Sequence, residues 1–524
     1  MFHSIRRSVL RTALTGTAIV ATVEVTTHLP SEGRSSLAYH SFCDNFVSPL
    51  LRRLLNPEDA HAVAIQCAKQ QLAPRHHPSA LEQLVDLQTT VWGITVSNPI
   101  GLAAGFDKDA QIPGPMLQLG FGTVEVGTVT PLPQPGNPSP RMFRLIPDGG
   151  IINRYGFNSQ GATIVADNLK QFRNGPQLQI DNNNNKEVET NHPTSSQPLH
   201  QILHLLQLIS KTGLYLWHLT FPGPTYHAPL IVGVNLGKNK DSANDQIILD
   251  YQIGIRTMGD YADYLVINIS SPNTPGLTEL QRPEALQELL AATIHERNQL
   301  SCPTVPLLVK LSPDLSNDEL MDIANIVISC GIDGLIVTNT TNARPSSLQS
   351  PHKNELGGLS GVPLKDRSTE CIRILYQATQ GTVPIIGVGG ISNAHDVMEK
   401  LKAGASLVQL YSALALEGPG IVSRMRHDLA ALMRQEGFKT VAEIVGYDHE
   451  EMYWKKQQLK MEQQRILSHD IMVTDDMNAN DPTPAAKDLT QMVTEEKLVP
   501  QDENFDDDDG SNDKNESLLS EHDE

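Results

Sequence analysis

The chain has 524 residues and a formal net charge of -20, which is length enough for a barrel of about 250 residues or for two to three smaller domains. Residues 450–524 hold 21 acidic and 7 basic residues, so 14 of the 20 net negative charges lie in this tail. The sequence has no basic stripe of the kind that binds a phosphate backbone, which argues against nucleic acid as a partner. Its five cysteines are scattered and form no CxxC pair, so neither a disulfide framework nor a metal site is predicted.

Residues 1–30 have the composition of a mitochondrial presequence. They contain Arg6, Arg7 and Arg11, several hydroxyl residues, and no acidic residue before Glu24. The apolar run within them, residues 13–23, is shorter than the roughly 18 residues that indicate a spanning helix. A cleaved presequence and a retained membrane anchor therefore both remain open.

Residues 40–75 are predicted to form a small helical, membrane-associating domain. Apolar residues recur at helical spacing on both sides of Asn56 and Pro57, which indicates two short amphipathic helices joined by a turn. Such a pair usually packs on its own domain. Its place directly after the N-terminal apolar run makes a membrane-facing role the alternative.

Residues 85–448 alternate short apolar runs with longer helical stretches, the pattern of parallel strands joined by crossover helices. The eight runs are "LAAGF" from Leu102, "TVEVGTV" from Thr123, "LIVGVNL" from Leu230, "YLVINIS" from Tyr264, "LLVKLS" from Leu307, "GLIVTN" from Gly334, "IIGVGG" from Ile385 and "LVQLYS" from Leu407. Eight strand–helix units predict an α/β fold of the (β/α)8 TIM-barrel type. A doubly wound sheet is the alternative, but its phosphate-binding glycines would follow an early strand, whereas here they follow the seventh.

Two segments fall outside this alternation. Residues 173–222 form a low-complexity insertion. Its Asn-rich part, up to about His200, lacks the apolar content to pack into a core, whereas the following "QILHLLQLISKTGLYLWHL" could form an amphipathic helix. Residues 449–524 are predicted to be a helical extension followed by an acidic, disordered tail.

Polar residues close most of the apolar runs, where the strands of a barrel carry their chemistry. They are Asp107 and Lys108, Gly127 and Thr128, Asn235, Asn268, Lys310, and Thr338 to Thr340. The segment "INRYGFNS" adds Asn153 and Asn158, which we expect on a loop over the barrel mouth. Carboxamides present a donor and an acceptor on one planar head, so this set suits a ring whose edge alternates C=O and N–H, such as a pyrimidine or an isoalloxazine.

A phosphate site is predicted after the seventh and eighth runs. "GVGGIS" offers backbone N–H groups without obstructing side chains, and "LVQLYSA" adds Tyr411 and Ser412. Neither a P-loop nor a GxGxxG fingerprint is present, so a nucleoside triphosphate or a Rossmann-bound NAD is not supported.

The chain resembles the class 2 dihydroorotate dehydrogenases, membrane-associated FMN enzymes of pyrimidine (UMP) synthesis. The segments that carry the resemblance are "NPIGLAAGFDKD", "GFGTVEVGTVTPLPQPGNPSPRMFRL", "INRYGFNS", "VGVNLGKNK", "INISSPNTPGL", "LLVKLSPDL", "GLIVTNTT", "GGLSGVPL", "GVGGIS" and "AGASLVQLYSA". The resemblance implies oxidation of (S)-dihydroorotate to orotate at the mitochondrial inner membrane, with a membrane quinone, expected to be ubiquinone, as the final acceptor.

The resemblance also assigns the ligand sites. It implies an FMN site made of Ala103, Ala104, Gly105, Lys108, Gly127, Thr128, Asn153, Asn235, Asn268, Lys310, Thr338, Ser360, Gly361, Gly389, Gly390, Tyr411 and Ser412. It implies a substrate site made of Lys108, Asn153, Tyr155, Gly156, Phe157, Asn268, Asn273, Asn339 and Thr340, with Lys108 near the substrate carboxylate.

By the same resemblance, Ser271 is the base that removes the C5 proton while the C6 hydride goes to flavin N5. A serine hydroxyl needs a relay to act as a base, and Thr274 is a candidate for it. His61, Arg144 and Tyr411 match residues of the quinone tunnel. Because the helical pair is assigned to the quinone and the barrel to dihydroorotate, a protein that lacks residues 1–74 is expected to keep its dihydroorotate reaction.

Two other functions stay in competition. One is a soluble FMN dehydrogenase that uses fumarate or NAD, which serine at position 271 and the N-terminal extension disfavour, because the related soluble enzymes use a cysteine. The other is a catalytically silent flavin-binding or membrane scaffold, against which the intact polar set argues.

Overall fold

The computed structural model describes residues 40–449 except 42, 71, 175–229 and 275, together with residues 451 and 458. All of these but residue 458 belong to one compact unit, residues 1–456. The predicted presequence, nearly all of the Asn-rich insertion and nearly all of the C-terminal tail lie outside the described residues.

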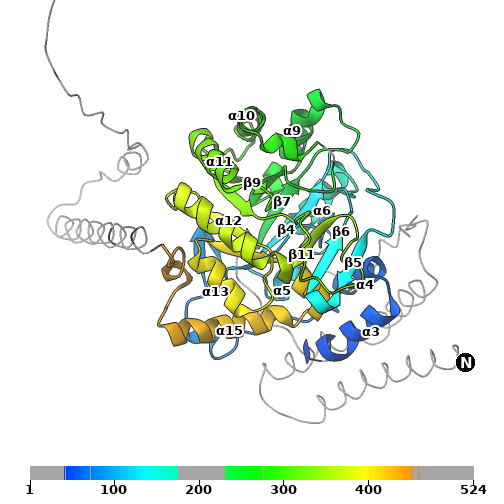
Figure 1. The fold of residues 1–524 in the computed structure, drawn as a ribbon, viewed down its shortest axis with the longest axis vertical. Helices are drawn as coiled ribbons and strands as arrows, with labels where there is room; N and C mark the ends of the chain where they lie inside the picture. Colours follow the sequence, from blue (N-terminus) through cyan, green and yellow to red (C-terminus); the bar gives the residue numbers. More distant parts are fainter. Residues whose placement is uncertain are drawn as a thin grey trace, which may run out of the picture. The chain divides into compact units, whose positions relative to one another are not determined.

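Eight parallel strands close into a barrel (Figure 1). In chain order they are β3 (Ile100–Leu102), β4 (Thr123–Val129), β7 (Ile231–Leu236), β8 (Tyr264–Asn268), β9 (Leu307–Leu311), β10 (Gly334–Val337), β12 (Ile385–Val388) and β13 (Leu407–Leu410). This confirms the predicted (β/α)8 barrel. The strands are buried almost throughout, which is why each one reads as an apolar run. The first strand ends at Leu102, so the segment Ala103–Phe106, predicted as part of it, is the loop that follows.

Helices follow the strands and cover the outside of the barrel (Figure 1). They are α5 (Pro113–Gln118), α6 (Ala162–Asn174), α9 (Ile247–Met258), α10 (Pro283–Arg297), α11 (Asn317–Cys330), α12 (Lys365–Ala378), α13 (Ala394–Lys402), α14 (Ser412–Glu417) and α15 (Ile421–Glu436). Their ends follow local sequence rules: α11 begins with a capping box between Ser316 and Glu319 and ends at Gly331, whose φ is 71°. Because α6 continues to Asn174, the first two residues assigned to the insertion are helical.

A short hairpin closes the amino-terminal end of the barrel. Its strands β1 (Thr89–Val91) and β2 (Ile94–Val96) meet at Trp92 and Gly93, which have φ values of 54° and 74°, as a type I′ turn requires. Val91 and Val96 pack in one apolar cluster with residues at the start of the barrel strands. The indole Nε1 of Trp92 donates a hydrogen bond of 2.6 Å to the carbonyl of Asp333, just before β10.

A separate antiparallel sheet stands at the carboxyl ends of the barrel strands. It pairs β5 (Met142–Leu145) and β11 (Gly358–Gly361) on either side of β6 (Gly150–Asn153), although β11 lies about 200 residues further along the chain. The sequence did not predict this sheet. Asn153 is its last residue on β6, so the expectation of a loop at Asn153 is wrong, while Asn158 does lie in the loop that follows.

Among the described residues, two α-helices come before the barrel in the chain. A π-helical turn (Cys43–Val47) leads into α3 (Ser48–Leu54), and α4 (Pro57–Lys69) follows. Asn56 caps α4 by accepting a 2.9 Å hydrogen bond from the backbone N–H of Asp59. Helix α4 packs against β5 and α5 (Figure 1). Within the described residues, no helix has the length and apolar character needed to cross a membrane.

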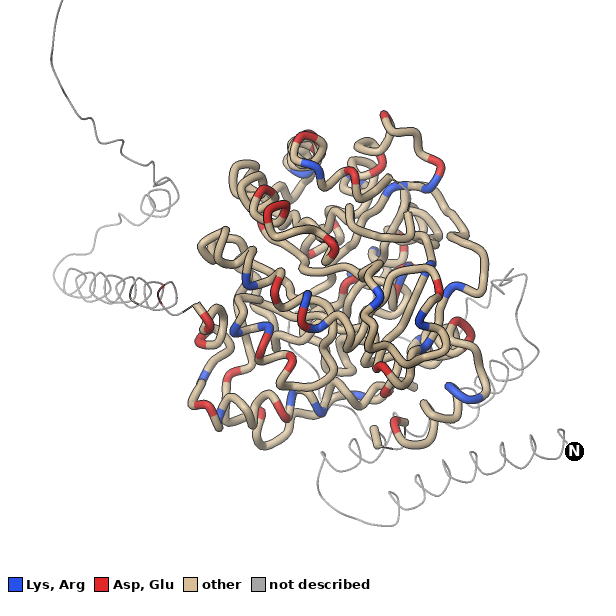
Figure 2. Tube along the Cα trace, in the orientation of Figure 1, with Lys and Arg blue, Asp and Glu red and all other residues tan. Residues whose placement is uncertain are grey.

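Charges of both signs are interspersed over the described part of the chain (Figure 2). Several form ion pairs, such as Arg256 with Glu296 and Arg373 with Asp448. The surface therefore shows no extended field of a single sign there.

Candidate active site

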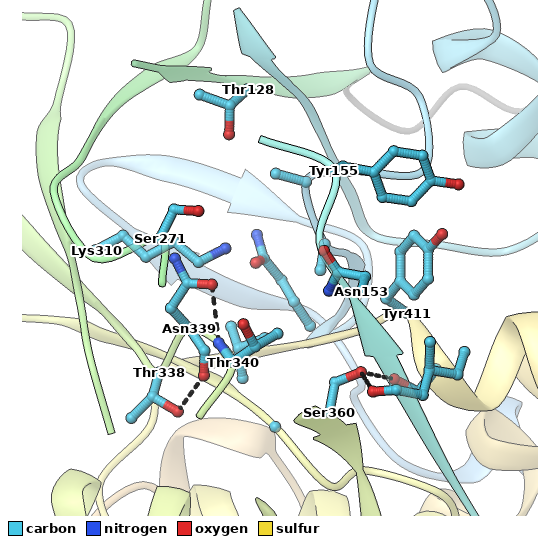
Figure 3. Close-up of a pocket in the computed structure, with 18 of the residues that line it drawn as sticks. Thr128, Asn153, Tyr155, Ser271, Lys310, Thr338, Asn339, Thr340, Ser360 and Tyr411 are labelled. Carbon is cyan, nitrogen blue, oxygen red and sulfur yellow. Dashed lines mark hydrogen bonds between the residues drawn. The ribbon is translucent and has the colours of Figure 1, made fainter. Parts of the chain in front are cut away.

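A cavity lies at the carboxyl ends of the barrel strands, beneath β6 and β11 (Figure 3). It encloses about 1110 Å³ of space, part of which is open to solvent. Most of the residues predicted as site residues line it together. They are Ala103, Ala104, Gly105, Lys108, Thr128, Asn153, Tyr155, Gly156, Phe157, Asn268, Ser271, Asn273, Lys310, Thr338, Asn339, Thr340, Ser360, Gly361, Gly389, Gly390, Tyr411 and Ser412.

Other lining residues were missed by sequence reasoning. They are mainly apolar side chains at the ends of strands or on the antiparallel sheet: Met142, Ile151, Leu364, Val388, Ile391, Gln409 and Leu410. From the sequence alone, an apolar residue at a strand end that lines a cavity cannot be distinguished from one that packs in the core. Gln409, polar within an otherwise apolar run, was the one available signal.

Carboxamides from neighbouring strands form a hydrogen-bonded chain across the cavity floor. Asn268 Nδ2 donates to Asn235 Oδ1 at 2.9 Å, and Thr128 Oγ1 donates to the same oxygen at 2.6 Å. Asn339 Nδ2 donates to Asn268 Oδ1 at 3.2 Å. Asn235 lies beneath the lining residues, so it holds Asn268 and Thr128 in place and does not itself face the cavity.

A buried carboxylate, Glu125, anchors this chain from below. It is fully buried, accepts 2.8 Å hydrogen bonds from Asn235 Nδ2 and Gln409 Nε2, and lies 4.0 Å from Lys310 Nζ. Burial lowers the pKa of Lys310, and Glu125 opposes that shift. The sequence signal for Glu125 was a single acidic residue inside the apolar strand "TVEVGTV".

Ser271 follows β8 and faces the cavity opposite Asn153 (Figure 3). It is 7% exposed, and its Oγ accepts a long hydrogen bond of 3.4 Å from the backbone N–H of Asn273. Asn273 Nδ2 in turn donates to Asn153 Oδ1 at 3.3 Å, so the Ser271 loop is tied to β6. Thr274 Oγ1 is buried and has no hydrogen-bond partner among the described residues.

Lys108 supplies positive charge at one side of the cavity. Its Nζ lies 4.2 Å from the centroid of the Tyr155 ring, a cation–π contact. Burial lowers the pKa of Lys108 to about 8, although nearby Asp109 opposes the shift. The ammonium is therefore largely charged at neutral pH and is suited to binding a carboxylate.

Glycines and hydroxyls occupy the end of the cavity near β12 and β13. Gly389 and Gly390 have φ values of 122° and 74°, a conformation that favours glycine. Ser412 Oγ donates to Ser360 Oγ at 2.9 Å, which donates to the carbonyl of Ile151 at 3.1 Å (Figure 3). The phosphate site predicted from the sequence falls at this end of the cavity. Gly127 lies outside the lining, and the oxygen of its carbonyl accepts a 2.7 Å hydrogen bond from the N–H of Gly105.

The three residues assigned to a quinone tunnel lie along the helical pair. His61 Nε2 donates to the carbonyl of Phe106 at 2.8 Å, and its ring centroid is 6.5 Å from that of Tyr411. Burial lowers the pKa of His61 to about 4, so its imidazole is neutral. Arg144 Nη1 donates to the carbonyls of Arg52 and Leu55 at the end of α3. Of the three, only Tyr411 lines the main cavity.

Comparison with known proteins identifies the family. The family model for dihydroorotate dehydrogenase matches residues 86–433, two thirds of the chain. This chain belongs to the dihydroorotate dehydrogenase family. A dihydroorotate dehydrogenase (quinone), mitochondrial, of Mus musculus is 43% identical over 78% of this chain and 91% of its own length. A protein of the same description from Schizosaccharomyces pombe is 42% identical over 76% of this chain and 84% of its own.

Bacterial and structural relatives agree with this membership. A dihydroorotate dehydrogenase (quinone) of Rhodospirillum rubrum is 43% identical over 75% of this chain and 92% of its own length. A crystal structure of DHODH from Eimeria tenella, in complex with ferulenol, aligns with a TM-score of 0.63 at 36% identity, covering 76% of this chain and 99% of that one. Dihydroorotate dehydrogenases are in general flavoenzymes.

Proposed function

We propose that this dihydroorotate dehydrogenase oxidises (S)-dihydroorotate to orotate with FMN as cofactor and a membrane quinone as final acceptor, in de novo pyrimidine synthesis. The observation that carries the proposal is the convergence of Ser271, Lys108 and the carboxamides on one cavity in a chain of this family. The relatives named for the quinone reaction include mitochondrial and bacterial proteins.

The residues present fit FMN. The cavity holds buried polar atoms without a partner among the described residues, namely Asn158 Oδ1, Thr340 Oγ1 and Gln409 Oε1. Such atoms are costly unless a ligand or water binds them. Gly389, Gly390 and Ser412 would hold the phosphate, and Lys310 with the floor amides would hold the polar edge of the ring. Bound FMN would supply the redox chemistry, accepting a hydride from the substrate and releasing electrons to the quinone.

The chain's own residues bind and orient the substrate. Lys108 would hold the carboxylate, while Asn153, Asn273 and Asn339 read the C=O and N–H groups of the ring edge. Ser271 would then take the proton from C5. Thr274 is the candidate to pass it on, because its buried hydroxyl is not engaged by any other described residue. The quinone would approach along α3 and α4, near His61, Arg144 and Tyr411.

For location we propose the mitochondrial inner membrane. Residues 1–30 supply the basic, acid-poor leader, and relatives described as mitochondrial are among the similar proteins. A fusion of residues 1–30 to a fluorescent protein tests the targeting part directly. Cytosolic fluorescence would contradict it.

One experiment tests the function. The absorption spectrum of the purified protein is recorded before and after anaerobic addition of dihydroorotate, and then after addition of a quinone, fumarate or NAD. Bleaching that only the quinone reverses supports the proposal. A flavin spectrum that dihydroorotate leaves unchanged would indicate the silent scaffold, and recovery with fumarate or NAD would indicate a soluble-type dehydrogenase.

A further inference from the structure

Glu58, in the first turn of α4, binds the segment that leads into β5. Its Oε1 accepts hydrogen bonds from Ser139 Oγ at 3.0 Å and from the backbone N–H of Arg141 at 3.3 Å. Its Oε2 accepts from Arg141 Nε at 2.9 Å. The side chains of Glu58 and Arg141 are only 24% and 10% exposed, so solvent screens this ion pair less than a surface pair.

Arg141 also contacts the Tyr155 ring, against which Lys108 packs. Its guanidinium lies 4.8 Å from the centroid of the Tyr155 ring, and Lys108 Nζ lies 4.2 Å from the same centroid. Arg141 Nη1 also donates to the carbonyls of Pro135 at 2.7 Å and Asn137 at 3.0 Å, which fixes the plane of the guanidinium. Because Tyr155 is 9% exposed, the ring has little room to move away from either cation.

A second contact from α4 reaches the loop of Lys108 itself. His61, three residues after Glu58, donates from Nε2 to the carbonyl of Phe106, two residues before Lys108. The His61 and Phe106 rings also pack with centroids 4.9 Å apart. Helix α4 therefore holds both the loop that carries Lys108 and the residues that Lys108 packs against.

We infer that helix α4 organises the substrate-carboxylate site, with Glu58 acting through Arg141 and the Tyr155 ring as a positioning residue for Lys108. This rests on the proposed function and extends it: the helix assigned to the quinone also sets the affinity for dihydroorotate. The separation of the two half-reactions expected from the sequence does not hold under this arrangement.

The charges around Lys108 give the inference a measurable signature. The groups that face it are Asp109 on its own loop, Arg141 before β5, the Tyr155 ring, and Glu58 and His61 on α4. Beyond the effect of burial, Asp109 and Glu58 raise the pKa of Lys108 and Arg141 lowers it. Removing the charge of Glu58 leaves Asp109 alone to oppose the effect of Arg141, so the Lys108 ammonium would lose its proton at a lower pH.

The test compares Glu58→Gln with Glu355→Gln in the full-length flavoprotein. Glu355 is a matched control, because it pairs with Arg154 at 2.9 Å, Arg154 stacks at 4.7 Å from the Phe143 ring, and Lys108 is not involved. Orotate binding is titrated through the absorption of the bound flavin between roughly pH 6 and pH 10, a range that brackets the pKa of Lys108.

Glu58→Gln is expected to weaken orotate binding roughly tenfold at about pH 8, and to shift the alkaline loss of binding to lower pH. The rate of flavin reduction at saturating dihydroorotate should stay within about threefold of wild type, because uniform substrate binding affects affinity more than the chemical step. Glu355→Gln should follow wild type, and Glu58→Asp, which keeps the charge, should restore the pH profile.

Several outcomes would overturn the inference. The inference is wrong if Glu58→Gln binds orotate with the affinity and pH profile of the wild type. It is also wrong if Glu58→Gln and Glu355→Gln change the orotate affinity equally. If Glu58→Gln does not retain flavin, Glu58→Asp provides the test. A Glu58→Asp protein that folds normally but binds orotate with a shifted pH profile would contradict a role for the charge of Glu58. Failure of the wild-type flavin to be reduced by dihydroorotate would instead refute the proposed function.

Discussion

Arg173, in the last turn of α6, donates a hydrogen bond of 2.9 Å to the carbonyl of Leu230, the residue before β7. Its other guanidinium nitrogens donate to Asp263 Oδ2 at 2.6 Å and to the carbonyl of Tyr261 at 3.0 Å. One side chain thus holds together the two points between which residues 175–229 are inserted. These contacts hold the end of α6 beside the start of β7.

Deleting Gly175–Gln197 should therefore leave FMN content and turnover nearly unchanged. The free energy of loop closure depends only weakly on loop length, and the contacts of Arg173 remain. Flavin absorbance and steady-state activity measure this. Arg173→Ala is the comparison, because it keeps the insertion and removes the side-chain contacts of Arg173. This variant should have a lower melting temperature. Loss of flavin in the deletion variant would mean that the segment packs on the barrel.

Ser271→Ala should keep bound FMN but slow flavin reduction by at least about a hundredfold, because general-base contributions are roughly 10² to 10⁴. Anaerobic stopped-flow reduction by dihydroorotate gives the rate. Thr274→Val, which replaces the hydroxyl with a methyl group, should slow the same step if Thr274 relays the proton. Near-normal reduction in Ser271→Ala would refute its assignment as the base.

Orotate binding should weaken as the pH rises through about 8. Lys108 is charged below its pKa, which burial lowers to about 8, and only the ammonium attracts a carboxylate. The dissociation constant is measured by flavin absorption across this range, with Lys108→Met as a variant that should bind weakly at every pH. An affinity independent of pH up to about pH 10 would place the carboxylate away from Lys108.

Glu125→Gln should lower the free energy of unfolding by about 3 to 5 kcal/mol, because it leaves Lys310 buried without its counter-charge and places an N–H against the donors of Asn235 or Gln409. Denaturant unfolding measures the change. Glu288→Gln, at an exposed position within α10, should change it by no more than about 0.5 kcal/mol. Similar values for both variants would show that the network below the cavity adds little to stability.

Removing residues 1–74 should impair both half-reactions, because it takes away Glu58 and His61 as well as the helices assigned to the quinone. The dissociation constant for dihydroorotate should rise, and reoxidation by a long-tailed quinone should be lost more completely than reoxidation by a small soluble acceptor. Unchanged dihydroorotate affinity in this protein would favour independent half-reactions.

The barrel could be predicted because its strands are buried on both faces and read as apolar runs, each ending in a chemically distinct residue. The positions of Lys108, Asn268 and Lys310 in the cavity follow from that order alone. The pairing of β6 with β11 could not be predicted, since a contact across about 200 residues leaves no local pattern in "GLSG". The contact of Glu58 with Arg141 could not be predicted for the same reason. In the sequence, each of the two residues alone has the appearance of an ordinary surface charge.

The hairpin formed by β1 and β2 fills one end of the barrel, with Val91 and Val96 packed onto the starts of the strands and Trp92 bonded to Asp333. Small molecules are thereby confined to the opposite end of the barrel, where, under the proposed function, dihydroorotate would enter and orotate would leave. Under the same proposal, the quinone would also reach the flavin from that half of the barrel. Any separation of the two paths would then lie around the rim of the barrel and not along its length, because Tyr155 and Tyr411 both line the same cavity.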